Sequence, residues 1–446
     1  MWRVLYNILI VALSPVIVAI LLAKQRCRRG LLFRLGLRVT PLSDPAEPLR
    51  PVIWVHAVSL GEVVAVTPLV KELHRRHPDR LVLVSTVTET GREAVEQRLA
   101  GVAEHRYAPL DLPWAVSRTV ARWQPALYVF VETELWPNLL WQLHDRGVPT
   151  VLVNGRLSSR SFSRQHVRGL RSFYRSVLRT MTLCLMQSER DVERIVALGA
   201  EPSRVKRTGN IKFDQPLPAA LADPSWRASL GVGMQESLIL AGSTHAGEEE
   251  ILVAAYRDIV AHHPQAVLMM APRHIERVDA VMEMVRAAGL PVQRKSRLSG
   301  HATGPRVIIL DTRGELARAY GDAVVTFVGG TLVPVGGHNL LEPAAWGKPV
   351  LFGPHTDHCA EIASLLSESG GGRRVVSARE LAENASTWLR DAAACREAGD
   401  AARRTVSENQ GALVRSVELI EEYLRPAPMP ASRSVDPESA HAAARH

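Results

Sequence analysis

The sequence predicts an α/β protein made of two doubly wound, Rossmann-like domains that face a central cleft, preceded by an N-terminal transmembrane anchor helix. Its 446 residues exceed the ~100 to 200 of a typical single domain. After Asp44, short apolar runs alternate with longer amphipathic stretches, which is the pattern of β-α units in parallel sheets. A Pro-rich stretch at residues 214–225 interrupts this alternation near the middle of the chain.

The N-terminal segment, residues 4–23, is apolar except for Asn7 and Ser14. Twenty residues at about 1.5 Å each match a hydrocarbon core of ~30 Å. The run is longer than a signal peptide's core and is followed by KQRCRR rather than a cleavage site, so we favour an uncleaved, single-pass anchor over a signal peptide or a buried first helix. The basic residues behind it favour a cytoplasmic location for the rest of the chain. Pro15 also leaves room for an interfacial or kinked helix.

The predicted strands of the first domain are residues 52–56, 81–86, 126–131, 150–154, 183–186 and 205–208. Helical patterns between them include residues 61–76, 135–145 and 188–197. The second domain repeats the rhythm, with strands at 238–241, 266–271, 307–310, 323–328 and 349–352 and a helix at 248–262. We therefore expect an anchor at 1–30, an N-terminal domain at 31–213, a linker at 214–226, a C-terminal domain at 227–425 and a disordered tail at 426–446.

The net charge of +9 is concentrated in two basic zones. Residues 1–43 contain seven basic side chains and no acid, and residues 146–188 contain eight arginines and no acid or lysine. The remainder of the chain is therefore acidic, at −6. The positive charge is thus local and is not a property of the whole chain, as it would be in a basic nucleic-acid-binding protein. We therefore expect no nucleic-acid partner.

The arginines of the second zone recur about every four residues, so on one helix they would share a broad face. Like charges at this spacing repel unless an anion meets them, and arginine favours bidentate phosphate contact. Nucleic acid, an acidic phospholipid and a phosphorylated substrate all fit this chemistry, and the nearby anchor favours the last two. The arginines are Arg146, Arg156, Arg160, Arg164, Arg168, Arg171, Arg175 and Arg179.

Ligands of open parallel sheets bind at the loops that follow the strands. The first such loop contains Glu62 at the mouth of a helix, where the helix dipole and backbone N–H groups favour its ionised form. Glu62 suits a general base, although it could equally complement the first turn of its helix. The loop after residue 131 contains Glu132 and Glu134, and Lys212 is a candidate partner for one of them. Alternatively, Thr133 and Glu134 only begin a helix.

The second domain contains candidate phosphate contacts in three loops. Arg273 follows one strand, Gly314 and Glu315 form a turn after another, and the segment VGGTLVPVGGHNLLEP places Asn339 and Glu342 at a helix start. Glu342 could accept hydrogen bonds from ribose hydroxyls. The histidines in GPHTDH match no standard metal-ligand spacing and no Asp-x-Asp pair is present, so we expect no metal ion.

Several motifs in this order resemble the Kdo transferases of Gram-negative bacteria, which are 3-deoxy-D-manno-oct-2-ulosonic acid transferases of the GT-B fold. They are HAVSLGEV, ETELWPNL, NGRLSxRSF, GNIKFD, AGSTHxGEE, APRH, GEL and VGGTLVPVGGHNLLEPAAWGKPVLFGP. The resemblance implies transfer of Kdo from CMP-Kdo to lipid IVA, a tetraacylated lipid A precursor, at the cytoplasmic face of the bacterial inner membrane. It also implies inversion at the sugar carbon, no metal and no cofactor.

The resemblance also implies roles for individual residues. Glu62 would be the base that deprotonates the acceptor 6′-hydroxyl, and Glu132 and Lys212 would stabilise the transition state. The residues that would hold CMP are Pro272, Arg273, Gly314, Glu315, Leu316, Asn339, Leu340, Leu341 and Glu342. The alternatives are another GT-B enzyme that uses a UDP-sugar and a lipid acceptor, or a membrane-anchored lectin or scaffold without activity.

Overall fold

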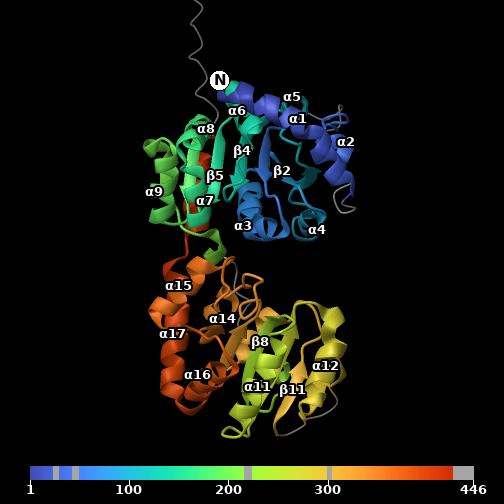
Figure 1. Cartoon of the computed structure of the whole chain (residues 1–446), viewed down its shortest axis with the longest axis vertical. Coiled ribbons are helices and arrows are strands. Elements are labelled where there is room, and N and C mark those ends of the chain that lie inside the picture. The colour runs from blue at the N-terminus through green and yellow to red at the C-terminus, as the bar shows by residue number, and fades with distance from the viewer. Residues whose placement is uncertain (24–29, 43–49, 215–223, 299–303, 425–446) are drawn as a thin grey trace, which may run out of the picture. The chain divides into compact units, whose positions relative to one another are not determined.

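The computed structural model describes residues 1–23, 30–42, 50–214, 224–298 and 304–424. The chain forms two compact units (Figure 1). Unit 1 comprises Met1–Asp214 together with the segment from Gly411 onward, and unit 2 comprises Gln215–Gln410. The expected tail at 426–446 and most of the expected linker lie outside the described residues.

Unit 1 contains a seven-stranded parallel sheet in the order β3-β2-β1-β4-β5-β6-β7. Its strands are β1 (Val52–His56), β2 (Leu81–Thr86), β3 (Glu104–Tyr107), β4 (Pro125–Val131), β5 (Thr150–Gly155), β6 (Leu183–Met186) and β7 (Val205–Arg207). Its α-helices are α1 (Trp2–Ala23), α2 (Leu31–Arg34), α3 (Leu60–Arg76), α4 (Glu89–Arg98), α5 (Pro113–Trp123), α6 (Pro137–Asp145), α7 (Ser159–Gln165), α8 (Arg168–Leu178), α9 (Glu189–Leu198) and α18 (Ala412–Glu421). The 3-10 helices η2 (Pro202–Arg204) and η3 (Ile211–Asp214) flank β7.

Unit 2 repeats this architecture in a second parallel sheet of order β10-β11-β9-β8-β12-β13-β14. Its strands are β8 (Ser237–Thr244), β9 (Ala266–Pro272), β10 (Val292–Arg294), β11 (Arg306–Ile309), β12 (Val325–Val328), β13 (Val350–Phe352) and β14 (Gly372–Arg374). Its α-helices are α10 (Pro224–Ser229), α11 (Glu249–Val260), α12 (Val278–Ala287), α13 (Leu316–Ala319), α14 (Leu341–Ala345), α15 (Ala360–Ser369), α16 (Ala378–Arg390) and α17 (Ala392–Glu408). The predicted doubly wound α/β class is confirmed in both units.

Both faces of the unit 1 sheet are covered by helices, which explains why its central strands are apolar throughout rather than alternating. Ile53 and Val55 of β1 pack with residues of α3, α4 and α18, whereas Trp54 on the opposite face packs with residues of α5, α6 and α8. Every residue of β1 is buried. This two-sided burial holds the carboxyl ends of the strands rigidly, and the loops that leave those ends present the candidate carboxylates.

The C-terminal boundary that we expected for the second domain is wrong. Residues from Gly411 to the end of α18 return to unit 1, because the Asp214 carboxylate accepts hydrogen bonds from Gly411 N (2.6 Å) and Leu413 N (2.7 Å). Val417 and Ile420 then join the core beside β1. The C-terminal unit therefore ends at Gln410, not at residue 425, and the expected linker is partly helical because α10 begins at residue 224.

The arginines of the second basic zone do not share one helix, as we had expected. The chain ends α7 at Gln165 and begins α8 at Arg168, so the stripe is divided between two short helices. Some of its arginines also have partners inside the protein. Arg171 Nε donates to Ala197 O (2.9 Å) at the end of α9, and Arg146 Nη1 donates to Gln142 O (3.2 Å). Part of this charge therefore stabilises carbonyl groups of unit 1 itself.

Candidate active site

Glu62 lies in the first turn of α3, directly after the loop that leaves β1. Its carboxylate accepts hydrogen bonds from Val58 N (2.8 Å) and Ser59 Oγ (2.9 Å). These two bonds lower the pKa of Glu62, as we expected for a helix start, but burial outweighs them and raises the pKa to about 7. The negative charges of Glu132 and Glu134 add to this increase. With a pKa of about 7, the Glu62 carboxyl group is protonated in part and ionised in part near neutral pH.

Glu132 follows the last residue of β4 and has a left-handed backbone conformation, with φ 57°. A non-glycine residue pays a conformational penalty there, and such strain persists only where the surroundings hold it. The Glu132 carboxylate lies 3.5 Å from Lys212 Nζ, so Glu132 is the one of the two glutamates with which Lys212 pairs.

Lys212 is held in position through the backbone of η3. Lys212 N donates to Asn210 Oδ1 (3.0 Å), and the preceding Ile211 N donates to Asn154 Oδ1 (3.1 Å) at the end of β5. Asn154 is also left-handed, with φ 56°. The cation and the carboxylate that it pairs with are thus placed by the ends of two neighbouring strands, β4 and β5.

Glu134 does not begin a helix, contrary to one of the two readings of this loop. Helix α6 starts at Pro137, and the Thr133 hydroxyl donates to Arg156 O instead of capping it. Burial raises the pKa of Glu134, and the charge of Glu132 raises it further. Glu134 instead belongs to the carboxylate cluster that the two glutamates at i and i+2 indicated, since its charge also raises the pKa of Glu62.

Unit 2 contains a polar pocket of about 440 Å³ at the carboxyl ends of β8, β9 and β11. Four of the residues expected to hold the nucleotide line it, namely Pro272, Arg273, Gly314 and Leu316. Gly314 has φ 83°, a conformation that favours glycine and lets the backbone turn at the pocket wall. The Glu315 side chain is outside the lining and pairs with Lys295 Nζ (2.8 Å).

The remaining expected nucleotide contacts, Asn339 to Glu342, do not line this pocket. Asn339 Oδ1 accepts a hydrogen bond from Leu341 N (3.2 Å), and Asn339 Nδ2 donates to Glu342 Oε1 (3.2 Å). Leu340 and Leu341 are buried, so only their backbone is suited to contact a ligand. Burial raises the pKa of Glu342. Helix α14 is only five residues long.

Two features of unit 2 have no clear signal in the sequence. The first is a stacked histidine pair, with His245 Nε2 2.8 Å from His338 Nε2 and the ring centroids 5.0 Å apart. Burial, together with the neighbouring histidines and Arg273, lowers the pKa of His338 to about 4. Gly330 allows this approach, because a Cβ at this position would lie 2.9 Å from the His338 ring.

The second feature is Glu248, whose side chain is fully buried at the start of α11. Its carboxylate accepts hydrogen bonds from Gly330 N (2.7 Å), Thr331 N (2.9 Å), Leu332 N (2.8 Å) and His245 N (3.0 Å). Glu248 therefore fixes the glycine-containing loop that follows β12. The run of three glutamates at 248–250 resembled an ordinary acidic helix start, so the sequence did not single this residue out.

Within the described part of the chain, no group of three or more His, Cys, Asp or Glu side chains is arranged to hold a metal ion.

Comparison with solved structures gives the fold. A glycosyltransferase from Rickettsia africae matches with a TM-score of 0.56 at 13% identity, covering 85% of this chain and all of that one. The UDP-GlcNAc 2-epimerase from Neisseria meningitidis matches with a TM-score of 0.56 at 12% identity, covering 84% of this chain and 99% of that one. Two parallel seven-stranded sheets and these neighbours define a GT-B glycosyltransferase fold.

Sequence comparison then gives the family. The model of 3-deoxy-D-manno-octulosonic-acid transferase matches residues 31–215. The 3-deoxy-D-manno-octulosonic acid transferase of Haemophilus influenzae is 34% identical over 429 residues, which are 95% of this chain and 99% of that protein. The enzyme of the same name from Bordetella pertussis is 35% identical over 390 residues, which are 84% of this chain and 88% of that protein. The chain therefore belongs to the 3-deoxy-D-manno-octulosonic acid (Kdo) transferase family and is a glycosyltransferase.

Proposed function

We propose that the protein transfers Kdo from CMP-Kdo to the 6′-hydroxyl of lipid IVA in lipopolysaccharide biosynthesis, with inversion and without a metal ion. The observation that carries this proposal is Glu62, a buried carboxyl group with a pKa of about 7 in the loop after β1. A general base is most effective when its pKa lies near the working pH. Glu62 deprotonates the acceptor hydroxyl as the oxygen attacks the sugar.

The pair formed by Glu132 and Lys212 supplies fixed charge beside this base. Lys212 Nζ is positioned by η3 and stabilises the carboxylate of Kdo, while the Glu132 carboxylate stabilises positive charge that develops on the sugar ring. Preorganised charges of this kind act without reorganisation during the reaction, and removal of one typically costs about 10²- to 10³-fold in kcat. We propose no metal ion because the ammonium group of Lys212 provides the positive charge at this site.

The pocket of unit 2 binds the CMP part of the donor. Arg273 provides a guanidinium for the phosphate, and Pro272, Gly314 and Leu316 form part of the wall around it. The segment Asn339 to Glu342 contributes hydrogen bonds outside this lining, with Glu342 suited to ribose hydroxyls. The leaving group is CMP, and its phosphate is already a good leaving group.

The acceptor is a lipid, so we place the protein at the bacterial inner membrane with its body on the cytoplasmic face. Among the described residues, α1 is the one helix long and apolar enough to cross a membrane. The arginines of the second basic zone, where they remain exposed, suit the phosphates of lipid IVA and anionic phospholipids. No nucleic acid and no cofactor take part in this reaction.

The proposal is tested by incubating the purified protein with lipid IVA and either CMP-Kdo or UDP-sugars. We expect a mass increase of one or more Kdo residues with CMP-Kdo and none with the UDP-sugars. Transfer from a UDP-sugar would replace this proposal with the other GT-B reaction. Binding of the donor without transfer to any acceptor would instead favour a lectin.

A further inference from the structure

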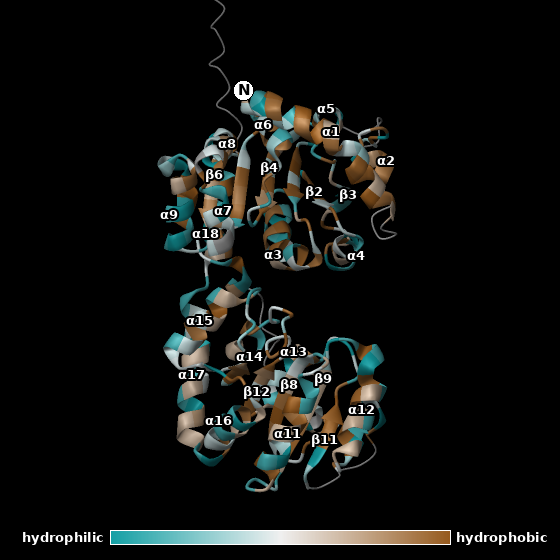
Figure 2. Ribbon diagram, in the orientation of Figure 1, coloured by the Kyte–Doolittle hydropathy of each residue, from teal (hydrophilic) through white to brown (hydrophobic). Residues whose placement is uncertain are grey.

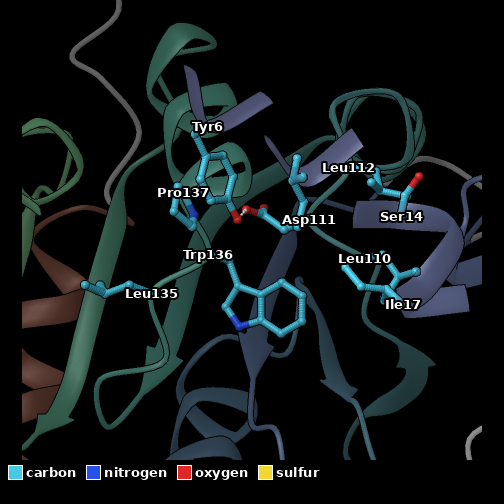
Figure 3. Close-up of a pocket in the computed structure, with 10 residues that line it drawn as sticks. Tyr6, Ser14, Ile17, Leu110, Asp111, Leu112, Leu135, Trp136 and Pro137 are labelled. Atoms are coloured by element: carbon cyan, nitrogen blue, oxygen red, sulfur yellow. Dashed lines mark hydrogen bonds between the residues drawn. The ribbon is translucent and has the colours of Figure 1, made fainter. Parts of the chain in front are cut away.

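A cavity of about 240 Å³ lies between α1 and the rest of unit 1 (Figure 3). Helix α1 forms one wall, and the other walls come from the loops that follow β3 and β4. The residues contributed by α1 are Tyr6, Ile10, Ser14 and Ile17, and those from the loops are Leu110, Asp111, Leu112, Leu135, Trp136 and Pro137. None of these residues belongs to the pocket or the carboxylate cluster described above.

The polar groups in this lining are already hydrogen-bonded within the protein. The Tyr6 hydroxyl donates to Asp111 Oδ2 (2.8 Å), and the same carboxylate accepts bonds from Asn138 N (3.0 Å) and Leu139 N (3.0 Å) at the start of α6. Ser14 Oγ donates to Val11 O (2.8 Å) in its own helix. What the lining offers to a ligand is therefore mainly apolar surface from Ile10, Ile17 and their partners.

Helix α1 separates this cavity from an apolar outer surface. Half-buried residues recur along the helix at intervals of four, three, four, three and four, namely Arg3, Asn7, Ile10, Ser14, Ile17 and Leu21. This spacing is a single stripe, so α1 lies along unit 1 over nearly its whole length. Arg3 pairs with Asp145 (2.6 Å) and Trp2 Nε1 donates to Ser172 Oγ (3.0 Å) at its first turn.

The opposite face of α1 is exposed and apolar. Figure 2 shows hydrophobic residues recurring along α1. It presents Val4, Leu5, Ile8, Leu9, Leu13, Val16 and Ile20. A helix with one face on its own domain and an apolar face exposed along its length suits the interfacial arrangement that Pro15 left open, in place of the transmembrane span that we expected from the sequence. Only helix α1 would then lie between the cavity and the hydrocarbon core of the membrane.

The cavity also adjoins the candidate active site along the chain. Leu135, Trp136 and Pro137 directly follow the loop of Glu132 and Glu134, and the Trp136 ring contacts the His56 ring at the end of β1, with centroids 5.5 Å apart. A group bound in the cavity would therefore be held by the same loop that positions the carboxylates.

We propose that this cavity binds one hydrocarbon chain of the lipid acceptor. The inference rests on the proposed function, which makes the acceptor a lipid, and adds the site where one of its acyl chains is held. Apolar cavities of about 150 Å³ stay dry and bind benzene, so 240 Å³ accommodates about ten carbon atoms in proportion. The chain enters from the membrane beside α1, and its burial helps to hold the sugar headgroup near the loop of Glu132.

The test fills the cavity and measures how the KM for the acceptor depends on chain length. With the wild-type protein, lengthening the acyl chains of the acceptor from six to ten carbons should lower KM, by up to about fourfold per methylene that enters the cavity, and lengthening beyond ten carbons should have little further effect. In Ile17→Trp and in Ile10→Trp the indole occupies this space. The KM for the long-chain acceptor should then rise at least tenfold, and its dependence on chain length should flatten.

The matched control is Ile8→Trp, which places the same side chain on the exposed face of α1. Ile8→Trp should keep the wild-type dependence, and all three variants should keep the KM for CMP-Kdo, which reports that they are folded. If phospholipid fills the cavity instead, Ile17→Trp will weaken binding to phosphatidylethanolamine–phosphatidylglycerol vesicles and leave the chain-length dependence of KM intact, which overturns the proposal.

Failure of this inference is distinguishable from failure of the proposed function. A wild-type protein that transfers no Kdo to any lipid acceptor contradicts the proposed function. A wild-type protein that transfers Kdo, with unchanged KM and chain-length dependence in both cavity variants, contradicts the acyl-chain site alone.

Discussion

Lys212 Nζ lies 3.5 Å from Glu132 Oε1, and Glu132 is one of four non-glycine residues with a left-handed backbone in the described part of the chain. Lys212 lies in η3, which follows β7, the last strand of unit 1, and Glu132 lies in the loop after β4. Because both groups are held by backbone geometry, the pair is present before any substrate binds.

We predict that Lys212→Met lowers kcat by about 10²-fold, because a preorganised positive charge is removed from the site where the Kdo carboxylate binds. The affinity for CMP should stay unchanged, since the nucleotide pocket belongs to unit 2. Steady-state kinetics with saturating acceptor measures the effect. Lys206→Met is the matched control, because Lys206 is exposed on β7. A loss in Lys212→Met of less than threefold would contradict the role of Lys212.

The pKa of Glu62 predicts a pH dependence of both activity and stability. As a base, Glu62 must be ionised, so kcat/KM should rise with pH and level off above a midpoint near pH 7. In the unfolded chain the pKa is 4.5, so the folded state binds the proton more tightly. The stability from this group is therefore complete below pH 4.5 and is lost as the pH rises through 7.

Glu62→Gln cannot ionise, and it should be more stable relative to the wild type at pH 8 than at pH 4.5, by up to about 3 kcal/mol. Denaturant unfolding at the two pH values measures this difference. An equal difference in the free energy of unfolding at both pH values would show that the pKa of Glu62 is not raised in the folded protein.

Glu248 should stabilise unit 2 by holding the loop that follows β12 in place. Glu248→Ala leaves four backbone N–H groups without their acceptor, two of which are buried, so we expect a loss of about 3–5 kcal/mol in the free energy of unfolding. Hydrogen exchange should accelerate at the amides of Gly330, Thr331 and Leu332. Glu250→Ala, at an exposed position of the same helix, is the control and should leave those amides protected. Unchanged exchange in Glu248→Ala would refute the assignment.

Arg273 should contribute to the affinity for CMP. Removal of a charge-assisted hydrogen bond to phosphate costs about 1.5–3 kcal/mol, so Arg273→Ala should weaken CMP binding about 10- to 100-fold in isothermal titration calorimetry. Arg286→Ala, an exposed arginine of α12, should bind CMP as the wild type does. Comparison of CMP with UDP on the same proteins also separates the two possible donor classes, and an unaltered Kd in Arg273→Ala would exclude this arginine as the phosphate contact.

The parts of the fold that follow from local pattern were predictable. Strands β1 and β2 have the expected bounds because apolar residues covered on both faces form uninterrupted runs. The strands β3, β10 and β14 were missed, since edge strands have one neighbour and tolerate polar residues such as those of Glu104–Tyr107. The return of α18 to unit 1 depends on the Asp214 carboxylate and amides about 200 positions later, which no local pattern encodes.

The features of the candidate site also fall into those that the sequence predicted and those that depend on tertiary structure. Charge and strand-end position predicted that Lys212 pairs with one of the two glutamates, and the structure shows that the partner is Glu132. The direction of the Glu62 pKa shift did not, because two local hydrogen bonds favour ionisation and only tertiary burial reverses their effect. The acyl-chain cavity was equally hidden, since it requires α1 to lie against loops more than a hundred residues away, at Asp111 and Trp136.

The role of Glu62 as the base is tested most directly by the mass of lipid IVA after incubation with CMP-Kdo and either wild-type protein or Glu62→Gln. We predict a Kdo adduct with the wild type and at least 10²-fold less product with Glu62→Gln, while both proteins bind CMP equally. Product formation by Glu62→Gln within tenfold of the wild type would contradict the claim that Glu62 is the base.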